Sequence, residues 1–345
     1  MAKTKVGIIN VTGYAGVELA RLLHQHPHVV LTSVTGRSAV GKRLDRVFPH
    51  LSGIDLTIET ELGDVGLAFS TIPHKESAPE VIPLLERDLK VVDLSADFRL
   101  KDAREYPVWY GFTHPAPKLL KRAVYGLTEL YRSQLATAQL VANPGCYATS
   151  AILALAPVVK GGLTGADIII DSKSGVSGAG RTVSLETHYS EANEDTTAYS
   201  LSGHRHLPEI VQELNLLCAQ PPPSVAFVPH LVPMARGILT TVYAPLTDKI
   251  ATSNKGGEEL RQLYRSFYKD EPFTVVVDSP PHTKHTWGSN RCLIYPTIDR
   301  RTGRLIVICC LDNLVKGGAG QAVQNMNLML GLPETTGLEA LAVYP

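Results

Sequence analysis

The sequence lacks an excess of charge of either sign. Lys and Arg together number 33, as do Asp and Glu, so no net field favours nucleic acid or an anionic membrane as a partner. No window holds the roughly 18 uninterrupted apolar residues that a membrane span requires, and the first residues lack the long apolar stretch of a signal peptide. We therefore expect a cytoplasmic protein that acts on a small molecule.

Cysteine is scarce and has no metal-binding spacing. The five cysteines form no C-x-x-C pair, and in a reducing compartment they are expected to be free thiols. Cys218, Cys292, Cys309 and Cys310 lie in core-like surroundings, where cysteine packs as a small hydrophobe. Only Cys146 has turn chemistry around it.

The 345 residues exceed what one hydrophobic core usually supports, so we expect two domains. The N-terminal part alternates short apolar runs with helical patterns, which is typical of an α/β fold with a Rossmann-type, doubly wound parallel sheet. The expected helices span 15–25 and 76–88, and the expected strands span 5–11, 29–35, 66–72, 90–95 and 138–143.

After residue 146 most strand-like runs follow one another without a helix between them. This pattern predicts an α+β domain with a mixed or antiparallel sheet. The helical segment 317–332 is expected to pack back on the first domain. We therefore expect a first domain of residues 1–145 and 314–345 and a second domain of residues 146–313. The strands of the second domain are expected at 166–174, 224–232, 237–246, 273–279 and 304–313.

The segment NVTGYAG, residues 10–16, joins the first expected strand to the first expected helix. A dinucleotide fold needs small residues here, so that the backbone can approach a pyrophosphate at the helix N-terminus. Asn10 replaces the usual first glycine, and asparagine tolerates left-handed backbone angles. We predict cofactor contacts from Gly13, Tyr14, Ala15 and Gly16. The alternative is a purely structural loop.

The end of the second expected strand carries a cation where an NAD-binding protein would offer an acidic residue. Arg37, with Ser38 beside it, can pair with the 2′-phosphate of NADP through a bidentate fork. NADP(H) is therefore the expected cofactor. The alternative is that Arg37 is a solvated loop cation.

Cys146 stands between a Pro-Gly turn and an expected helix in the segment NPGCYATS, residues 143–150. The helix dipole and the unpaired N–H groups of the first turn favour the reactive thiolate. The same N–H groups could receive an oxyanion when the sulfur attacks a carbonyl. The alternative is a buried, inert thiol.

The segment SGHRHLPEI, residues 202–210, supplies candidate proton carriers. His204 and His206 are suited to move protons near neutral pH, and Glu209 could orient one imidazole. The alternatives are a solvated loop or a metal site, but no thiol or carboxylate lies at the usual ligand spacing, so no metal is expected. The histidines at positions 24, 26 and 28 are expected on the surface.

The loop SKSGVSGAGR, residues 172–181, is rich in glycine and serine and carries two cations. Its backbone N–H groups could surround a nicotinamide ribose or an anionic substrate, although linkers have a similar composition. Ser177 and Gly178 of this loop are candidate cofactor ligands, and Asn313 is a third.

Several segments together make the chain similar to the N-acetyl-gamma-glutamyl-phosphate reductases, the NADPH enzymes of arginine biosynthesis. The resemblance runs from about residue 5 to residue 332 and implies a fold similar to aspartate-semialdehyde dehydrogenase and glyceraldehyde-3-phosphate dehydrogenase. It implies an NADP-binding first domain, a second domain for catalysis and oligomer contacts, and a homo-oligomer, either tetramer or dimer. The segments are GYAG, NPGCYAT, SGVSGAGR, GHRHLPEI, PHLVPMARGIL and KGGAGQAVQNMNLMLGL.

The resemblance also implies roles for single residues. Cys146 matches the family's nucleophile and His206 its acid/base residue, with His204 and Glu209 as supporting neighbours. Asn10 departs from the family's more usual glycine. The expected reaction forms a thioester on Cys146 from N-acetyl-L-glutamyl 5-phosphate, which NADPH then reduces to the 5-semialdehyde. Guanidinium and ammonium groups suit the phosphate and the α-carboxylate, and the candidates are Arg181, Arg236 and Lys173.

Two other functions stay open at this stage. The first is reduction of a related acyl phosphate, either aspartyl phosphate or a carrier-linked aminoadipyl or glutamyl phosphate. The acidic segment ETHYSEANEDTT, residues 186–197, disfavours an acidic carrier protein. The second is a catalytically inactive NADP-binding sensor, which the presence of both the thiol and the histidine pair disfavours.

Overall fold

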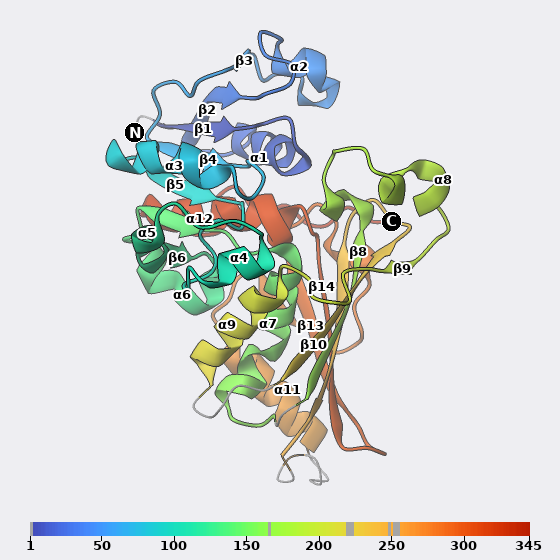
Figure 1. Ribbon diagram of the computed structural model, residues 1–345. Helices are drawn as coiled ribbons and strands as arrows, with labels where there is room; N and C mark the ends of the chain where they lie inside the picture. The colour runs from blue at the N-terminus through green and yellow to red at the C-terminus, as the bar shows by residue number, and fades with distance from the viewer. Residues whose placement is uncertain (1–2, 165–166, 219–223, 248–249, 251–255) are drawn as a thin grey trace. The chain divides into compact units, whose positions relative to one another are not determined.

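Two seven-stranded sheets organise the chain, each in a unit of its own (Figure 1). The computed structural model describes residues 3–164, 167–218, 224–247, 250 and 256–345. The first unit comprises Met1–Gly145 and Gly318–Ala340, and the second comprises Cys146–Gly317 and Leu341–Pro345. Among the described residues, no helix is both long and apolar enough to cross a membrane.

The sheet of the first unit is entirely parallel, with strand order β3-β2-β1-β4-β5-β7-β6. From β1 the chain moves outward to β2 and β3 on one side and to β4 and β5 on the other, with β7 inserted between β5 and the edge strand β6. This is the arrangement of a doubly wound sheet, so the predicted fold class is confirmed. Two-residue strands β3 and β6 were not expected. The strands are β1 (Thr4–Ile9), β2 (Val29–Thr35), β3 (Ile58–Glu59), β4 (Leu67–Ser70), β5 (Lys90–Asp93), β6 (Val124–Tyr125) and β7 (Leu140–Ala142).

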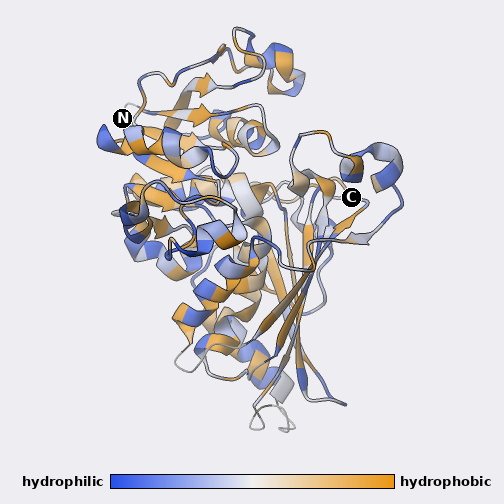
Figure 2. Ribbon diagram, in the orientation of Figure 1, coloured by the Kyte–Doolittle hydropathy of each residue, from blue (hydrophilic) through white to orange (hydrophobic). Residues whose placement is uncertain are grey.

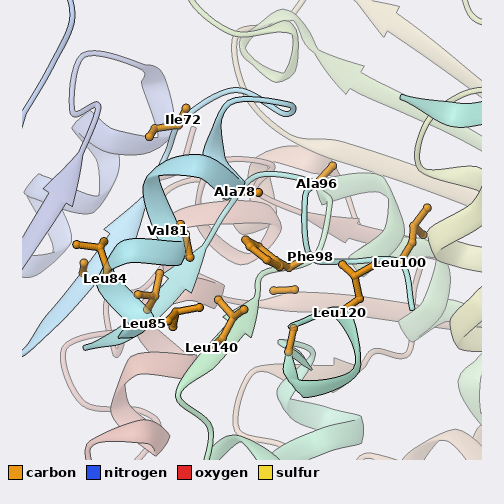
Figure 3. Close-up of a cluster of buried hydrophobic side chains, with 14 of the residues drawn as sticks. Ile72, Ala78, Val81, Leu84, Leu85, Ala96, Phe98, Leu100, Leu120 and Leu140 are labelled. Atoms are coloured by element: carbon orange, nitrogen blue, oxygen red, sulfur yellow. The ribbon is translucent and has the colours of Figure 1, made fainter. Parts of the chain in front are cut away.

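A cluster of buried apolar side chains joins one helix of this unit to its sheet (Figure 3). Val81, Leu84 and Leu85 of α3 pack with Phe98 and with Leu140 of β7. Each fully buried side chain of this size contributes about 1.5–3 kcal/mol. The helices of the unit are α1 (Tyr14–His24), α2 (Leu44–Val47), α3 (Ser77–Glu86), α4 (Glu105–Trp109), α5 (Pro117–Arg122), α6 (Thr128–Leu135) and α12 (Gly320–Met329).

The sheet of the second unit is mixed, as predicted. Its strand order is β12-β13-β14-β11-β8-β10-β9; β8 pairs with β10 and β12 with β13 in parallel, and the other pairs are antiparallel. Residue 166 of the first expected strand lies outside the described residues. The strands are β8 (Ile168–Gly175), β9 (Thr197–Ala198), β10 (Val225–Val232), β11 (Ile238–Pro245), β12 (Thr274–Val276), β13 (Cys292–Asp299) and β14 (Arg304–Leu311).

One face of this mixed sheet is covered by helices (Figure 1). They are α7 (Cys146–Lys160), α9 (Leu207–Leu217) and α11 (Gly256–Phe267), and the short α8 (Tyr189–Ala192) lies apart from them. Colouring by hydropathy shows apolar residues along the strands that these helices cover (Figure 2). This face therefore carries the core of the second unit.

The boundary between the units differs from the expected one at two places. Residues 314–317 belong to the second unit, because Asp312 accepts the N–H groups of Leu314 and Val315 at 2.8 and 3.2 Å and ties them to the end of β14. Residues 341–345 also belong to it, since the Val343 N–H donates to the Trp287 carbonyl at 2.9 Å.

Helix α12 lies in the first unit, where it contacts α1 and α6. The expectation that His26 lies on the surface is wrong, because His26 is only 1% exposed and contacts Asn327 of this helix. The Nε2 atom of His26 lies 2.9 Å from Oδ1 of Asn327. Burial lowers the pKa of His26, so the ring is held as a neutral hydrogen-bonding group.

Candidate active site

Cys146 is the first residue of α7, as the turn chemistry predicted. Its side chain is partly exposed, whereas Tyr147 and the rest of the helix through Val159 are buried. Gly317 lies against the cysteine: a Cβ atom at this glycine would come within 2.8 Å of the Cys146 Cβ. Only glycine there leaves room for the thiol.

The turn before the cysteine is anchored within the first unit through Asn143. Its N–H donates to the Asp93 carbonyl at 2.8 Å and its carbonyl accepts from Arg99 Nε at 2.8 Å. Its side-chain oxygen accepts from Asn325 Nδ2 at 3.1 Å, and its side-chain nitrogen donates to the Gly318 carbonyl at 3.2 Å. Sequence reasoning missed Arg99, which is 6% exposed; its position between Phe98 and Leu100 was the available signal.

Tyr147 brings the cysteine's helical turn to the predicted histidine pair. Its ring centroid lies 5.6 Å from that of His204 and 5.9 Å from that of His206, and the two imidazoles are 4.8 Å apart. Phe227 of β10 closes the cluster at 5.5 Å from Tyr147 and 5.4 Å from His204. The structure therefore gathers Cys146 and both histidines in one unit.

The two histidines are buried at the start of α9, not in a solvated loop. His204 is 7% and His206 8% exposed. Burial, reinforced by the charge of Arg205, lowers the pKa of His204 to about 4. His204 is therefore neutral at pH 7. Glu209 is fully buried in the first turn of α9, three residues after His206.

Two tyrosine hydroxyls line the same cluster. Tyr199, which sequence reasoning did not select, places its Oη atom 3.3 Å from that of Tyr147 and 3.4 Å from Nε2 of His204. Burial raises the pKa of Tyr199 to about 12 and raises that of Tyr147 further. Both hydroxyls are protonated across the physiological range.

The loop candidates for cofactor binding lie together in the second unit. Asn313 donates through Nδ2 to the Ser177 hydroxyl at 2.9 Å and accepts the Gly237 N–H through Oδ1 at 2.7 Å. A Cβ at Gly178 would lie 2.9 Å from the Ser174 hydroxyl, so a side chain there would require that hydroxyl to move. Gly178 is exposed beside the end of β8, whereas Asn313 is buried and its amide holds the Ser177 hydroxyl and the Gly237 N–H in place.

The three cations proposed for substrate anions have different surroundings. The Nε atom of Arg236 lies 3.4 Å from Oδ2 of the buried Asp312, and the Arg236 carbonyl accepts from Trp287 at 2.9 Å. This cation is held in place near the Ser177 loop, since Gly175 packs directly on the Arg236 backbone. Arg181 is exposed.

The structure corrects the expectation that Lys173 binds a substrate anion. The Ser172 hydroxyl lies 2.8 Å from Thr240, which contacts Ser150 of α7, so Ser172 faces the helices. Successive residues of a strand point to opposite faces. Lys173 therefore faces away from α7 and pairs with Asp171 at 2.7 Å. It is not positioned to bind a substrate at Cys146.

The nucleotide turn of the first unit has the geometry that a dinucleotide requires. Asn10 adopts a φ of 65°, the left-handed angle expected of it, and its side chain donates to the Thr71 carbonyl at 3.1 Å. Gly13 precedes α1, and a Cβ there would meet no atom within 4 Å. A Cβ at Gly16 would lie 2.6 Å from the Val11 carbonyl oxygen, so Gly16 permits the close approach of helix and strand.

The remaining cofactor candidates border this turn. Tyr14 is 41% exposed and Ala15 is partly exposed in the first turn of α1. Ser38 donates its hydroxyl to Thr12 at 3.3 Å. Arg37 is exposed and pairs with Glu76, which is also exposed. Exposed pairs of this kind contribute little, so an incoming phosphate can replace Glu76.

Comparison with known proteins places this geometry in a family. Two family models match: "Semialdehyde dehydrogenase, NAD binding domain" over residues 5–138 and "Semialdehyde dehydrogenase, dimerisation domain" over residues 146–313. The N-acetyl-gamma-glutamyl-phosphate reductase of Dehalococcoides mccartyi is 58% identical over 346 residues, covering 100% of both chains. That of Desulforamulus reducens is 48% identical over 350 residues, covering 99% of both.

The chain belongs to the N-acetyl-gamma-glutamyl-phosphate reductase family. Like other members of the semialdehyde dehydrogenase group, it is an oxidoreductase with an NAD(P)-binding domain. The crystal structure of aspartate semialdehyde dehydrogenase II from Vibrio cholerae shares the fold, with a TM-score of 0.71 at 17% identity over 95% of this chain and 99% of that one.

The two glycines of the nucleotide turn make a matched pair of variants. Gly16→Ala should lower the free energy of unfolding by about 1–3 kcal/mol, because the new methyl overlaps the Val11 backbone. Gly13→Ala should lower it by less, about 0.5–1 kcal/mol, since its Cβ meets open space and only the preference for glycine over alanine at the N-cap is lost. Urea unfolding measures both. Equal effects of the two substitutions would contradict the packing.

The buried neutral His204 should make stability depend on pH. The unfolded chain takes up this proton near pH 6.5 and the folded chain only near pH 4, so the unfolded state binds more protons between these values. The free energy of unfolding should therefore rise with pH across this window, by about 3 kcal/mol from this residue. The contribution of His204 to the free energy of unfolding is complete above pH 6.5 and is lost as the pH falls to 4.

Urea unfolding from pH 4 to 7 of the wild type and His204→Asn checks this dependence. The variant should show a flatter rise, whereas His50→Asn, at an exposed histidine, should keep the wild-type slope. A slope that His204→Asn leaves unchanged would show that His204 is not buried as a neutral ring.

Proposed function

We propose that the chain catalyses the NADPH-dependent reduction of N-acetyl-L-glutamyl 5-phosphate to N-acetyl-L-glutamate 5-semialdehyde and phosphate, a step of L-arginine biosynthesis. The full-length likeness to N-acetyl-gamma-glutamyl-phosphate reductases supports the substrate. The observation that carries the chemistry is the position of Cys146 at the start of α7, with Tyr147 packed against both imidazoles of the histidine pair.

Cys146 is the proposed nucleophile. Its thiolate attacks the carbonyl carbon of the acyl phosphate, the C–O bond to phosphate breaks, and the acyl group remains on the sulfur as a thioester. The first-turn N–H groups of α7 stabilise both the thiolate and the oxyanion that forms during attack. NADPH, when bound, supplies a hydride to the thioester carbonyl carbon. The C–S bond then breaks, which releases the aldehyde and returns the thiolate.

His206 is the proposed proton carrier of this reaction. It donates a proton to the oxygen of the thiohemiacetal and takes it back as that oxygen becomes the aldehyde carbonyl. His204 is unsuited to the task, because its low pKa leaves the ring neutral at pH 7 and a neutral imidazole is not an effective acid. Glu209, buried one helical turn away, is proposed to support the pair.

Two arginines are proposed for the negative groups of the substrate. Arg236, restrained by Asp312, and the exposed Arg181 both offer planar guanidinium forks to phosphate or carboxylate. Ser177, Gly178 and Asn313 are proposed to contact the cofactor from the second unit.

We also propose a homo-oligomer, either a dimer or a tetramer, that assembles through the second unit. The sheet face opposite α7 carries partly exposed apolar side chains, among them Ile169, Leu239 and Tyr295. The match of residues 146–313 to a dimerisation-domain model supports assembly through this unit.

The substrate is tested in the reverse direction. The protein is incubated with N-acetylglutamate semialdehyde, phosphate and NADP⁺, and absorbance of the reduced cofactor is followed, with aspartate semialdehyde as control. We expect reduction of NADP⁺ with the acetylated substrate and phosphate together. Faster turnover of aspartate semialdehyde, or turnover independent of phosphate, would overturn the proposal.

Replacing the sulfur isolates the role of the nucleophile. Cys146→Ser should lower kcat by at least about 10³-fold, because a serine hydroxyl is un-ionised at neutral pH. Cys218→Ser, at a partly buried cysteine of the same unit, should retain activity. A near-normal rate for Cys146→Ser, measured in the same assay, would remove Cys146 from the mechanism.

Replacing Arg37 tests the cofactor preference. Arg37→Ala should lower the ratio of kcat/KM for NADPH to that for NADH by roughly 10- to 100-fold, the loss expected for charge-assisted hydrogen bonds to the 2′-phosphate. Arg43→Ala, which removes an exposed arginine already paired with Asp45, should leave the ratio unchanged. An unaltered ratio in Arg37→Ala would refute the assignment.

A further inference from the structure

A chain of hydrogen bonds crosses the histidine cluster from a backbone carbonyl to a backbone amide. Tyr147 Oη lies 3.0 Å from the His230 carbonyl oxygen, and Tyr199 Oη lies 3.3 Å from Tyr147 Oη. His204 Nε2 lies 3.4 Å from Tyr199 Oη, and His204 Nδ1 lies 3.0 Å from the backbone nitrogen of His206. The chain ends at the proposed proton carrier.

The His230 carbonyl sets the donor and acceptor of the three hydrogen bonds from Tyr147 to His204. A carbonyl oxygen can only accept, so the single hydroxyl proton of Tyr147 is donated to His230. Tyr147 Oη then accepts the proton of Tyr199. Because Tyr199 has no second proton, its oxygen accepts from His204, which must carry a hydrogen on Nε2.

The amide end requires the same state independently. A backbone N–H can only donate, so His204 Nδ1 must accept the bond from His206 and carry no hydrogen. The two ends therefore specify one tautomer, neutral with its proton on Nε2. A protonated ring, or a proton on Nδ1, would place a hydrogen against the His206 N–H.

We propose that Tyr199 is a positioning residue, which holds His204 in the Nε2–H tautomer and thereby fixes the backbone of His206 at the start of α9. The proposal rests on the proposed function insofar as His206 carries the proton. It separates the two histidines: His204 has both nitrogens committed within the fold, and His206 alone exchanges a proton with the substrate.

The sheet edge fixes the position from which Tyr199 acts. Tyr199 directly follows β9, which pairs with β10. The Tyr199 N–H donates to the Pro229 carbonyl at 3.1 Å. The preceding segment from Arg181 is largely exposed. Tyr199 thus connects an exposed segment to the catalytic cluster through one buried hydroxyl.

Nitrogen NMR of the protein labelled with ¹⁵N-histidine tests the tautomer without requiring turnover. At pH 7 the wild type should show, for His204, a protonated Nε2 and an unprotonated Nδ1, assigned by loss of these signals in His204→Asn. In Tyr199→Phe the Nε2 shift of His204 should change, because its hydrogen-bond acceptor is lost, and both signals should broaden, because only the His206 N–H then favours the Nε2–H tautomer. Tyr189→Phe, at an exposed tyrosine of the same segment, should reproduce the wild-type spectrum.

Kinetics of the same variants give the functional readout. Tyr199→Phe should lower kcat by roughly 10- to 100-fold, the range known for outer partners that orient metal-binding histidines, with KM changed less than kcat. His204→Asn should retain more activity than His204→Ala, because an asparagine oxygen can replace Nδ1 as the acceptor from His206.

Two kinds of result would contradict the proposed role of Tyr199. A wild-type His204 that is protonated on Nδ1, or a Tyr199→Phe protein with unchanged ¹⁵N shifts and unchanged kcat, would overturn the proposal. Equal loss of activity in His204→Asn and His204→Ala would show that acceptance of the His206 N–H is not what His204 contributes, and would also overturn the proposal. Absence of reductase activity with the expected wild-type spectrum would refute the proposed function and leave the tautomer intact.

Discussion

The burial of α7 is the constraint on which the site of the second unit depends. Every residue of this helix from Tyr147 to Val159 is buried, so the helix cannot shift along its axis without moving apolar side chains that contribute about 1.5–3 kcal/mol each. The first turn is therefore fixed, and with it the sulfur of Cys146 and the ring of Tyr147. The histidines, the Tyr199 hydroxyl and Gly317 are arranged around this fixed turn.

Hydrogen bonds within the first unit hold Asn143 in place, three residues before this helix begins. Asn143 uses its backbone and both side-chain atoms to bind Asp93, Arg99, Gly318 and Asn325. Asn325 belongs to α12, which also donates through Gln321 to the Gly126 carbonyl at 2.9 Å. The C-terminal helix thus stabilises a turn nearly two hundred residues earlier in sequence, which explains why the first unit is discontinuous.

Sequence alone predicted features whose causes are local. The bounds of β2 and the left-handed angle of Asn10 follow from short-range patterns, and the start of α7 follows from its Pro-Gly turn. Features set by distant partners were missed. His26 is buried through its contact with Asn327, which lies 301 positions away in the sequence. The positioning role proposed for Tyr199 depends on its hydrogen bond to Tyr147. Lys173 was misjudged although the alternation of Ser172, Lys173 and Ser174 already placed it on the other face of its strand.

The central claim is that Cys146 carries an acyl group during the reaction. The direct measurement mixes the protein with N-acetylglutamate semialdehyde and NADP⁺ without phosphate, then combines rapid absorbance with mass spectrometry of the quenched protein. We predict a burst of reduced cofactor stoichiometric with subunits and an N-acetylglutamyl group on the peptide that contains Cys146. A burst without the adduct, or an adduct on another residue, would contradict the account.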